Sequence, residues 1–214
     1  MAAADGGAPR LEIRSDRLLL VEGRDEENLF EALLRHCFGP AASEDIQIIP
    51  AGGKHRFRKN LTAIAAAARA RPTLRAVGAI RDADDNALSA FQSVCDALRH
   101  AGYDPPSAHG QVSVGDPPVG VFILPDGTGA GAIETLCRRS VAGNEASRCV
   151  EAYIDCLKDR GALRSRNEDK TFAHAWLAGT NDPVARVGEG ARQGVWDFDS
   201  DAFAEIASFI RKLP

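Results

Sequence analysis

The chain has 214 residues, of which 44% are hydrophobic and 26% charged, and its formal net charge is −4. Such a composition is typical of a globular protein with a sizeable core, and no apolar run approaches the ~20 residues that a membrane-spanning helix needs. The negative charge argues against a protein that coats nucleic acid through a broad basic surface. It does not argue against a nuclease, because a carboxylate cluster is itself a source of negative charge.

The first twelve residues are rich in Ala and Gly but have neither a basic start nor a long apolar centre. We therefore expect residues 1–12 to form a disordered leader rather than a secretion signal. The five cysteines include no CxxC pair, and their number is odd. This usage favours reduced thiols and a cytoplasmic protein. The lack of a membrane-length apolar run predicts that it has no membrane association.

Apolar strand-like runs alternate with helix-like segments up to Gly131, a pattern that predicts parallel βαβ units. Strands are expected at about 17–21, 46–49, 74–80 and 119–124, and helices at about 25–37, 56–70 and 87–101. Later segments read as helices, at about 132–139, 145–160, 171–177 and 201–212. The expected fold is thus an α/β core over residues 13–131, with a parallel sheet flanked by helices. Residues 132–214 are expected to form a helical extension packed on that core.

Acidic residues stand where two of the expected strands stop. Glu22 follows the first strand, while Asp82 and Asp84 follow the third. If these strands are neighbours in a parallel sheet, they lie only ~5 Å apart, and the carboxylates would repel one another unless a cation held them. Hard divalent ions with oxygen ligands, Mg²⁺ first, suit such a cluster. The alternative is that Asp84, Asp85 or Asn86 simply caps the start of the following helix.

Basic residues follow the second expected strand, directly after a Gly-Gly turn. They are Lys54, His55, Arg56, Arg58 and Lys59. Ligands of open parallel sheets bind beyond the carboxyl ends of the strands, so Gly53, Lys54 and Arg56 are candidate contacts to phosphate. The alternative is a solvated helix start with no binding role.

The placement of Glu22-Gly23 after the first strand and of Asp82-Ala83-Asp84 after the third resembles the Toprim domain. This domain is shared by topoisomerases, bacterial primases, recombination mediators and the nucleases of the overcoming-lysogenization-defect class. The resemblance covers roughly residues 17–134. The whole chain, with Gly188-Glu189-Gly190 and the segment 195–199 near its end, is also similar to a small stand-alone, uncharacterised bacterial Toprim-like family related to those nucleases.

By this resemblance Glu22 is expected to be a metal ligand or general acid/base, and Asp82 and Asp84 to bind Mg²⁺, or Mn²⁺ in its place. Glu26 matches the second acid of a Glu-Gly-x-x-Glu motif that also reaches metal in the nucleases. The alternative for Glu26 is an ordinary first-turn acid favoured by the helix dipole.

The same nucleases use further acids and a lysine from downstream, for a second metal and the scissile phosphate. Asp126 and Glu134 are the acids available here, and Lys170 is the available catalytic lysine. Glu134 opens an expected helix, where acids are common for dipole reasons alone. A lysine between acids, as Lys170 is, is most often part of a surface ion pair.

The resulting hypothesis is a Mg²⁺-dependent nuclease or a related phosphodiester-processing enzyme acting on nucleic acid, on DNA in preference to RNA. One alternative is a non-catalytic Toprim module that binds nucleic acid or a partner protein. Another is a small-molecule phosphohydrolase that uses the same acids. Because the related nucleases carry an ATPase domain that is not in this sequence, a separate ATPase is a conceivable partner. The sequence leaves the oligomeric state open.

Overall fold

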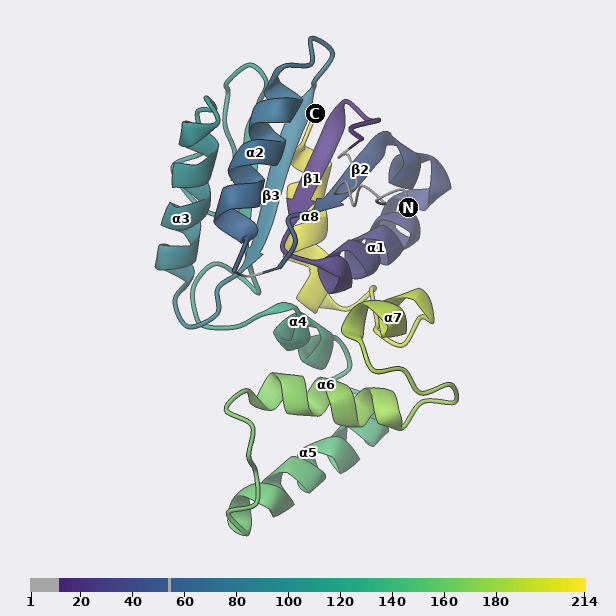
Figure 1. Cartoon of the computed structure of the whole chain (residues 1–214). Coiled ribbons are helices and arrows are strands. Elements are labelled where there is room, and N and C mark those ends of the chain that lie inside the picture. The colour runs from purple at the N-terminus through teal and green to yellow at the C-terminus, as the bar shows by residue number, and fades with distance from the viewer. Residues whose placement is uncertain (1–11, 54) are drawn as a thin grey trace, which may run out of the picture.

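The computed structural model describes residues 12–53 and 55–214, so most of the expected leader and Lys54 lie outside the described residues. Its centre is a five-stranded sheet with helices on both faces (Figure 1). The strands are β1 (Arg17–Val21), β2 (Ile46–Pro50), β3 (Ala76–Asp82), β4 (Gln111–Val112) and β5 (Val119–Leu124). Their order is β2-β1-β3-β5-β4, and only β4 runs antiparallel to its neighbour. The expected α/β class is confirmed, and β1 and β3 are neighbours, which is the condition for their terminal acids to meet.

Helices connect the strands and follow the sheet. They are α1 (Arg24–Asp45), α2 (Phe57–Arg69), α3 (Ala87–His100), α4 (Ile133–Ser140), α5 (Glu145–Asp159), α6 (Glu168–Ala178), α7 (Val187–Arg192), the 3₁₀ turn η1 (Asp201–Phe203) and α8 (Ala204–Lys212). None of the described helices is both long and apolar enough to cross a bilayer.

The main differences from the expected elements concern the first helix, the third strand and α7. The first helix breaks at Gly39, whose φ is 80°, and helical turns resume at Pro40 and continue to Asp45. The third strand starts and ends two residues later than expected, so Asp82 is the last residue of β3. The short helix α7 was not expected, because Gly188 and Gly190 lie inside it and glycine is a poor helix former.

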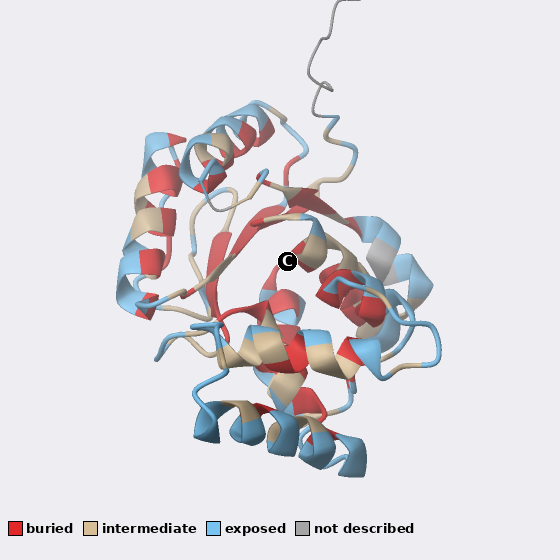
Figure 2. Ribbon diagram, turned by 60° about the horizontal axis from the view of Figure 1, so that its bottom comes forward, coloured by how far each residue is buried: buried red, intermediate tan, exposed pale blue. Residues whose placement is uncertain are grey.

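The sheet separates two layers of core, and alternate residues of each strand enter opposite layers. Leu18 and Leu20 of β1 pack against α2 and α3. Leu19 and Val21 face the layer formed by α1, α8 and the later helices. Figure 2 shows buried residues along the sheet and on the sides of the helices that face it.

Helix α8 approaches the sheet closely because two glycines leave room for it. Gly78 of β3 and Gly120 of β5 are direct partners across the strands. A Cβ atom at Gly78 would lie 2.7 Å from Leu213, and one at Gly120 would lie 2.7 Å from Phe209. Phe209 and Leu213, which lie far from the strands in sequence, are therefore part of the core of the sheet.

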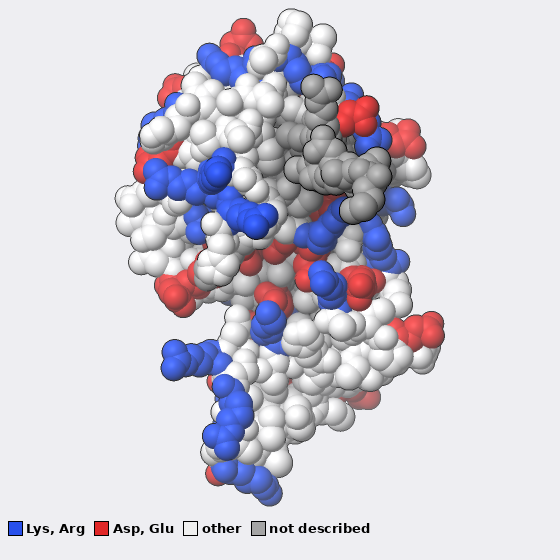
Figure 3. All heavy atoms as spheres, viewed as in Figure 1, with Lys and Arg blue, Asp and Glu red and all other residues white. Residues whose placement is uncertain are grey.

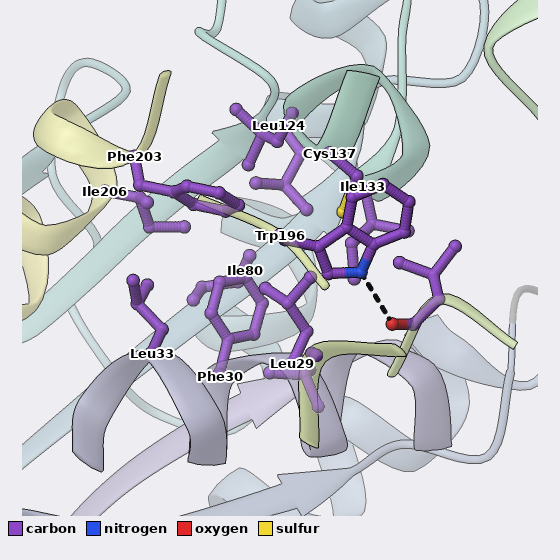
Figure 4. Close-up of a cluster of buried hydrophobic side chains, with 14 of the residues drawn as sticks. Leu29, Phe30, Leu33, Ile80, Leu124, Ile133, Cys137, Trp196, Phe203 and Ile206 are labelled. Atoms are coloured by element: carbon purple, nitrogen blue, oxygen red, sulfur yellow. Dashed lines mark hydrogen bonds between the residues drawn. The ribbon is translucent and has the colours of Figure 1, made fainter. Parts of the chain in front are cut away.

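The segments after β5 also share a core with α1. Figure 4 shows Trp196 beside Leu29, Ile133 and Cys137. The indole N–H of Trp196 donates a hydrogen bond of 2.9 Å to the carbonyl oxygen of Val187. Helix α4 therefore lies against the edge where the parallel strands end, and α6 and α5 follow beyond it (Figure 1).

Candidate functional site

The carboxyl ends of the parallel strands meet at the edge of the sheet that faces α4 (Figure 1). Glu22 follows β1 directly and is 8% exposed. Asp82 is the last residue of β3 and pairs in register with Leu124 of β5. Because β1 and β3 are neighbours, the two acids come from adjacent strand ends.

The first turn of α1 adds a third acid, Glu26, which is 9% exposed. Its carboxylate lies against Gly23, where a Cβ atom would be 3.1 Å from Oε2. Burial raises the pKa of Glu26 to about 7, and the negative charges of Glu22 and Asp25 add to this effect. Glu26 therefore exchanges a proton near neutral pH when no cation is bound.

Asp82 lies at the centre of the acid cluster, which we define as Glu22, Glu26, Asp82, Asp84 and Glu134. Burial raises the pKa of Asp82 well above its usual range, and the charges of the other four acids raise it further. One interaction works in the opposite direction, because the backbone N–H of Ile133 donates a hydrogen bond of 3.1 Å to Oδ1 of Asp82. The structure thus brings five of the expected site residues together.

Asp84 occupies an unusual backbone conformation. Its φ is 53°, in the left-handed region that favours glycine. Two backbone hydrogen bonds of 2.9 Å hold it to Gly131 in an isolated bridge. The capping role that was the alternative for Asp84 belongs instead to Asn86, whose side chain accepts from the N–H of Ser89.

Asp126 is engaged elsewhere. Its carboxylate accepts a hydrogen bond of 2.8 Å from Arg139 and others from Thr128, and these interactions lower its pKa to about 2. Thr128 is the larger of the two side-chain influences. The structure therefore gives Asp126 an ion pair rather than a place in the acid cluster.

The expected phosphate contacts lie beside the cluster, after β2. The N–H of Gly53 donates a hydrogen bond of 2.8 Å to the carbonyl oxygen of Glu22, so this amide is already used within the protein. Arg56, Arg58 and Lys59 are exposed at the start of α2. Figure 3 shows Lys and Arg side chains gathered over this helix, and acidic side chains in the hollow between the sheet and the later helices.

Arg81 is a cation at this edge that sequence reasoning missed. It precedes Asp82 in β3, and the alternation of the strand places it on the opposite face, where its guanidinium lies 5.2 Å from the ring centroid of Phe57. No carboxylate partner is found for Arg81 among the described residues. Its position immediately before Asp82 was the only available signal.

Lys170 is exposed in the first turn of α6. The neighbouring Asp169, not Lys170, joins α6 to α4, since it accepts hydrogen bonds from Thr135 at 2.6 Å and from Arg138 at 2.7 Å. Lys170 lies beside this connection, and among the described residues its side chain forms no hydrogen bond or ion pair with the acid cluster.

The acid cluster provides the all-oxygen donors that Mg²⁺ prefers. Within residues 12–53 and 55–214, however, no three His, Cys, Asp or Glu side chains are already spaced to hold a metal ion. The donor chemistry therefore fits a hard divalent ion, while the carboxylates would have to move closer together to bind it. The carboxylates repel one another, which is a physical reason why they lie farther apart than metal ligands would.

A family model described as "Protein of unknown function (DUF3226)" matches residues 16–214. No curated protein matches the chain. Two solved structures resemble it, both of the C-terminal region of the OLD protein of Xanthomonas campestris pv. campestris. The first, phased with platinum, is 15% identical, with a TM-score of 0.42 over 93% of this chain and 92% of that chain. The second, phased with iodine, is 14% identical, with a TM-score of 0.39 over 92% and 85%.

Proposed function

We propose that this chain, which belongs to the DUF3226 family of proteins of unknown function, is a Mg²⁺-dependent nuclease or a related phosphodiester-processing enzyme. The observation that carries the proposal is the acid cluster at the carboxyl edge of the parallel sheet, with Asp82 at its centre. The Toprim-like motif of Glu22 and Asp82-Ala83-Asp84 supports the same assignment and relates the chain to the overcoming-lysogenization-defect nucleases.

Each acid has a proposed role. Asp82 and Asp84 would hold Mg²⁺, or Mn²⁺ in its place, and Glu22 would act as ligand or general acid/base. Glu26 and Glu134 line the same cluster and would complete the coordination or bind a second ion. When bound, a divalent ion supplies Lewis-acid stabilisation of the charge that develops on the phosphoryl oxygens.

The surrounding charges favour a polyanionic substrate. The acid cluster alone would repel phosphate, but basic side chains gather on both sides of it (Figure 3). On one side are Arg56, Arg58 and Lys59 of the α2 region, all exposed. A nucleic acid backbone could contact these cations while a metal offsets the charge of the acids.

Metal-dependent cleavage tests the proposal. Single-stranded, nicked and supercoiled DNA and structured RNA are incubated with Mg²⁺ or Mn²⁺ and either the wild type or the double variant Asp82→Asn plus Asp84→Asn. Wild-type protein is expected to cleave at least one substrate and the double variant none. Asp104→Asn is the control, because it removes the same kind of charge at an exposed residue that lies outside the cluster. Cleavage that survives in the double variant would overturn the proposal.

One observation favours a second candidate, a non-catalytic module that binds nucleic acid. Among the described residues, no three acidic, His or Cys side chains are already spaced to hold a metal ion. A module that only binds nucleic acid would not need such a site. Such a protein would shift a nucleic acid in a gel and leave it intact with every divalent metal tested.

A chromogenic phosphate ester serves as a further substrate, because its turnover with all polymers intact would identify a small-molecule phosphohydrolase.

A further inference from the structure

We infer that the connection between α5 and α6 binds the backbone of the nucleic acid, with Arg164 and Arg166 as its phosphate contacts. The inference rests on the proposed function, since it supplies the path by which the substrate reaches the acid cluster. Nothing in the motif that suggested a nuclease includes these two residues.

A groove of about 510 Å³ joins this connection to the acid cluster. Asp84 and Asp85 line the groove together with Arg166 and Asn167. The volume lies within the range of about 300–1,000 Å³ found for ligand pockets. A bound strand could therefore contact Arg166 and approach Asp84 at the same time.

Of the two arginines that line the groove, Arg166 is the one that is free to bind an anion. The other arginine in the lining, Arg138, is held by Glu151 at 2.6 Å and by Asp169 at 2.7 Å. Among the described lining residues, Arg166 is the only basic side chain without a carboxylate partner. A phosphate that binds Arg166 breaks no ion pair of the folded protein.

Arg164 lies two residues earlier and is also exposed, with no acidic partner in the described part of the chain. Local hydrogen bonds fix the connection that carries both arginines. Ser165 Oγ donates to the carbonyl oxygen of Asn167 at 2.8 Å and accepts from its N–H at 3.1 Å. The Asn167 side chain in turn accepts from the N–H of Lys170 and caps α6. These hydrogen bonds hold the turn that carries Arg166 at the start of α6.

The two arginines extend the basic surface to the far side of the acid cluster. Figure 3 shows Lys and Arg side chains along the edge of the molecule formed by the α5–α6 connection, and a second group over α2. The acids lie in the hollow between the two groups. A strand that spans the hollow would be held at both ends, with one of its phosphates near the acids.

The groove also indicates how the strand is recognised. No aromatic side chain is among its described lining residues. Stacking on aromatic rings is the usual way to hold bases of a single strand, so contacts here would be to the backbone. Such binding depends strongly on salt and little on sequence.

The test measures binding separately from cleavage. A fluorescently labelled single-stranded DNA oligonucleotide is titrated in EDTA, where metal-dependent cleavage cannot occur, with anisotropy as the readout. The double variant Arg164→Glu plus Arg166→Glu is expected to bind about tenfold more weakly than wild type at low salt. The slope of log affinity against log salt should become shallower by about 1 for each arginine lost.

Two controls accompany this variant. Arg186→Glu makes one such charge reversal at an exposed residue just before α7, outside the lining of the groove, and is expected to bind like wild type. Arg164→Lys plus Arg166→Lys keeps both charges and should retain most of the affinity. A labelled duplex in a parallel titration shows whether paired and single strands share the surface.

The outcomes separate this inference from the proposed function. If wild type fails to bind DNA, or if the glutamate variant binds as tightly as wild type, the inference is wrong. In the second case, metal-dependent cleavage that needs Asp82 and Asp84 would leave the nuclease proposal intact. If the glutamate variant alone loses binding but wild type cleaves nothing with any metal, the surface is supported and the nuclease proposal fails.

Discussion

The carboxylate of Asp82 accepts its hydrogen bond from the backbone N–H of Ile133, at 3.1 Å, and so joins the end of β3 to the start of α4. The first N–H groups of a helix carry partial positive charge, which favours a carboxylate at this position. The contact therefore opposes part of the repulsion from the other acids. It also makes the geometry of the cluster depend on a helix outside the βαβ units.

Removing the charge of Asp82 is expected to stabilise the protein while abolishing cleavage. Asp82→Asn keeps an oxygen that can accept from Ile133 but ends the repulsion with Glu22 and Glu26. We expect the free energy of unfolding near pH 8, measured with urea in EDTA, to rise by about 1 kcal/mol. Asp85→Asn, at an exposed residue, should change it by less than about 0.5 kcal/mol. A loss of stability in Asp82→Asn would contradict this account of the cluster.

The raised pKa of Glu26 predicts a pH dependence of stability. The folded protein holds this proton up to about pH 7, whereas the unfolded chain releases it near the ordinary value of 4.5. Stability from this group is therefore fully present below that ordinary value, falls as the pH rises, and is lost above about pH 7. The loss between pH 5 and 8 should be roughly 2–3 kcal/mol in metal-free wild type.

Glu26→Gln is the matched variant for this effect, since its amide does not titrate. The difference in unfolding free energy between the two pH values should shrink in Glu26→Gln, again measured with urea in EDTA. Added Mg²⁺ should stabilise wild type more near pH 8 than near pH 5, because protons compete with the ion for the carboxylates. Equal pH dependence in wild type and variant would show that Glu26 is not the group responsible.

The positive φ of Asp84 predicts that glycine at this position gives a more stable protein than alanine, the reverse of the usual order. Because its φ is 53°, Asp84→Gly should be more stable than Asp84→Ala by about 1 kcal/mol. Asp85, which has no positive φ, should show the opposite order for the same pair of substitutions. Denaturant titrations of the four variants provide the comparison, and alanine equal to glycine at residue 84 would refute the left-handed assignment.

A substitution at Gly188 tests how closely α7 packs against the start of α1. A Cβ atom there would lie 2.5 Å from the carbonyl oxygen of Asp25 and 2.7 Å from Asn28, so Gly188→Ala must displace one of the two helices. We expect a destabilisation of about 1–3 kcal/mol by urea unfolding. Gly143→Ala, where nothing lies within 4 Å of the added atom, is the control and should be close to neutral. A neutral Gly188→Ala would mean that the helices are not packed this closely.

Much of the α/β framework could be predicted from the sequence, because strands and helices here carry clear apolar periodicity. The span of β5 followed from such a pattern, whereas the adjacency of β1 and β3 was expected from the Toprim-type arrangement of the acids. The strand β4 could not be found, since two residues are too few to show alternation. Helix α7 was hidden by its glycines, which are needed for close packing rather than for helix formation.

The site was only partly predictable, for a related reason. Glu22 and Asp82 could be placed at one edge because strand topology fixes the ends of parallel strands. The ion pair of Asp126 with Arg139 depends on the path of a turn and a helix, which has no signature in sequence. The availability of Arg81 and Arg166 depends on which acids lie within reach, and only tertiary structure determines this.

The glycine pair in β3 and β5 has a consequence for how the polypeptide acquires its shape. Phe209 and Leu213 fill the space above Gly78 and Gly120, so one face of the central strands stays open to water until this distant segment has been synthesised. A fragment ending at residue 131 would expose that apolar surface and should aggregate rather than behave as an autonomous unit. We therefore expect the core and the C-terminal extension to fold together as one unit.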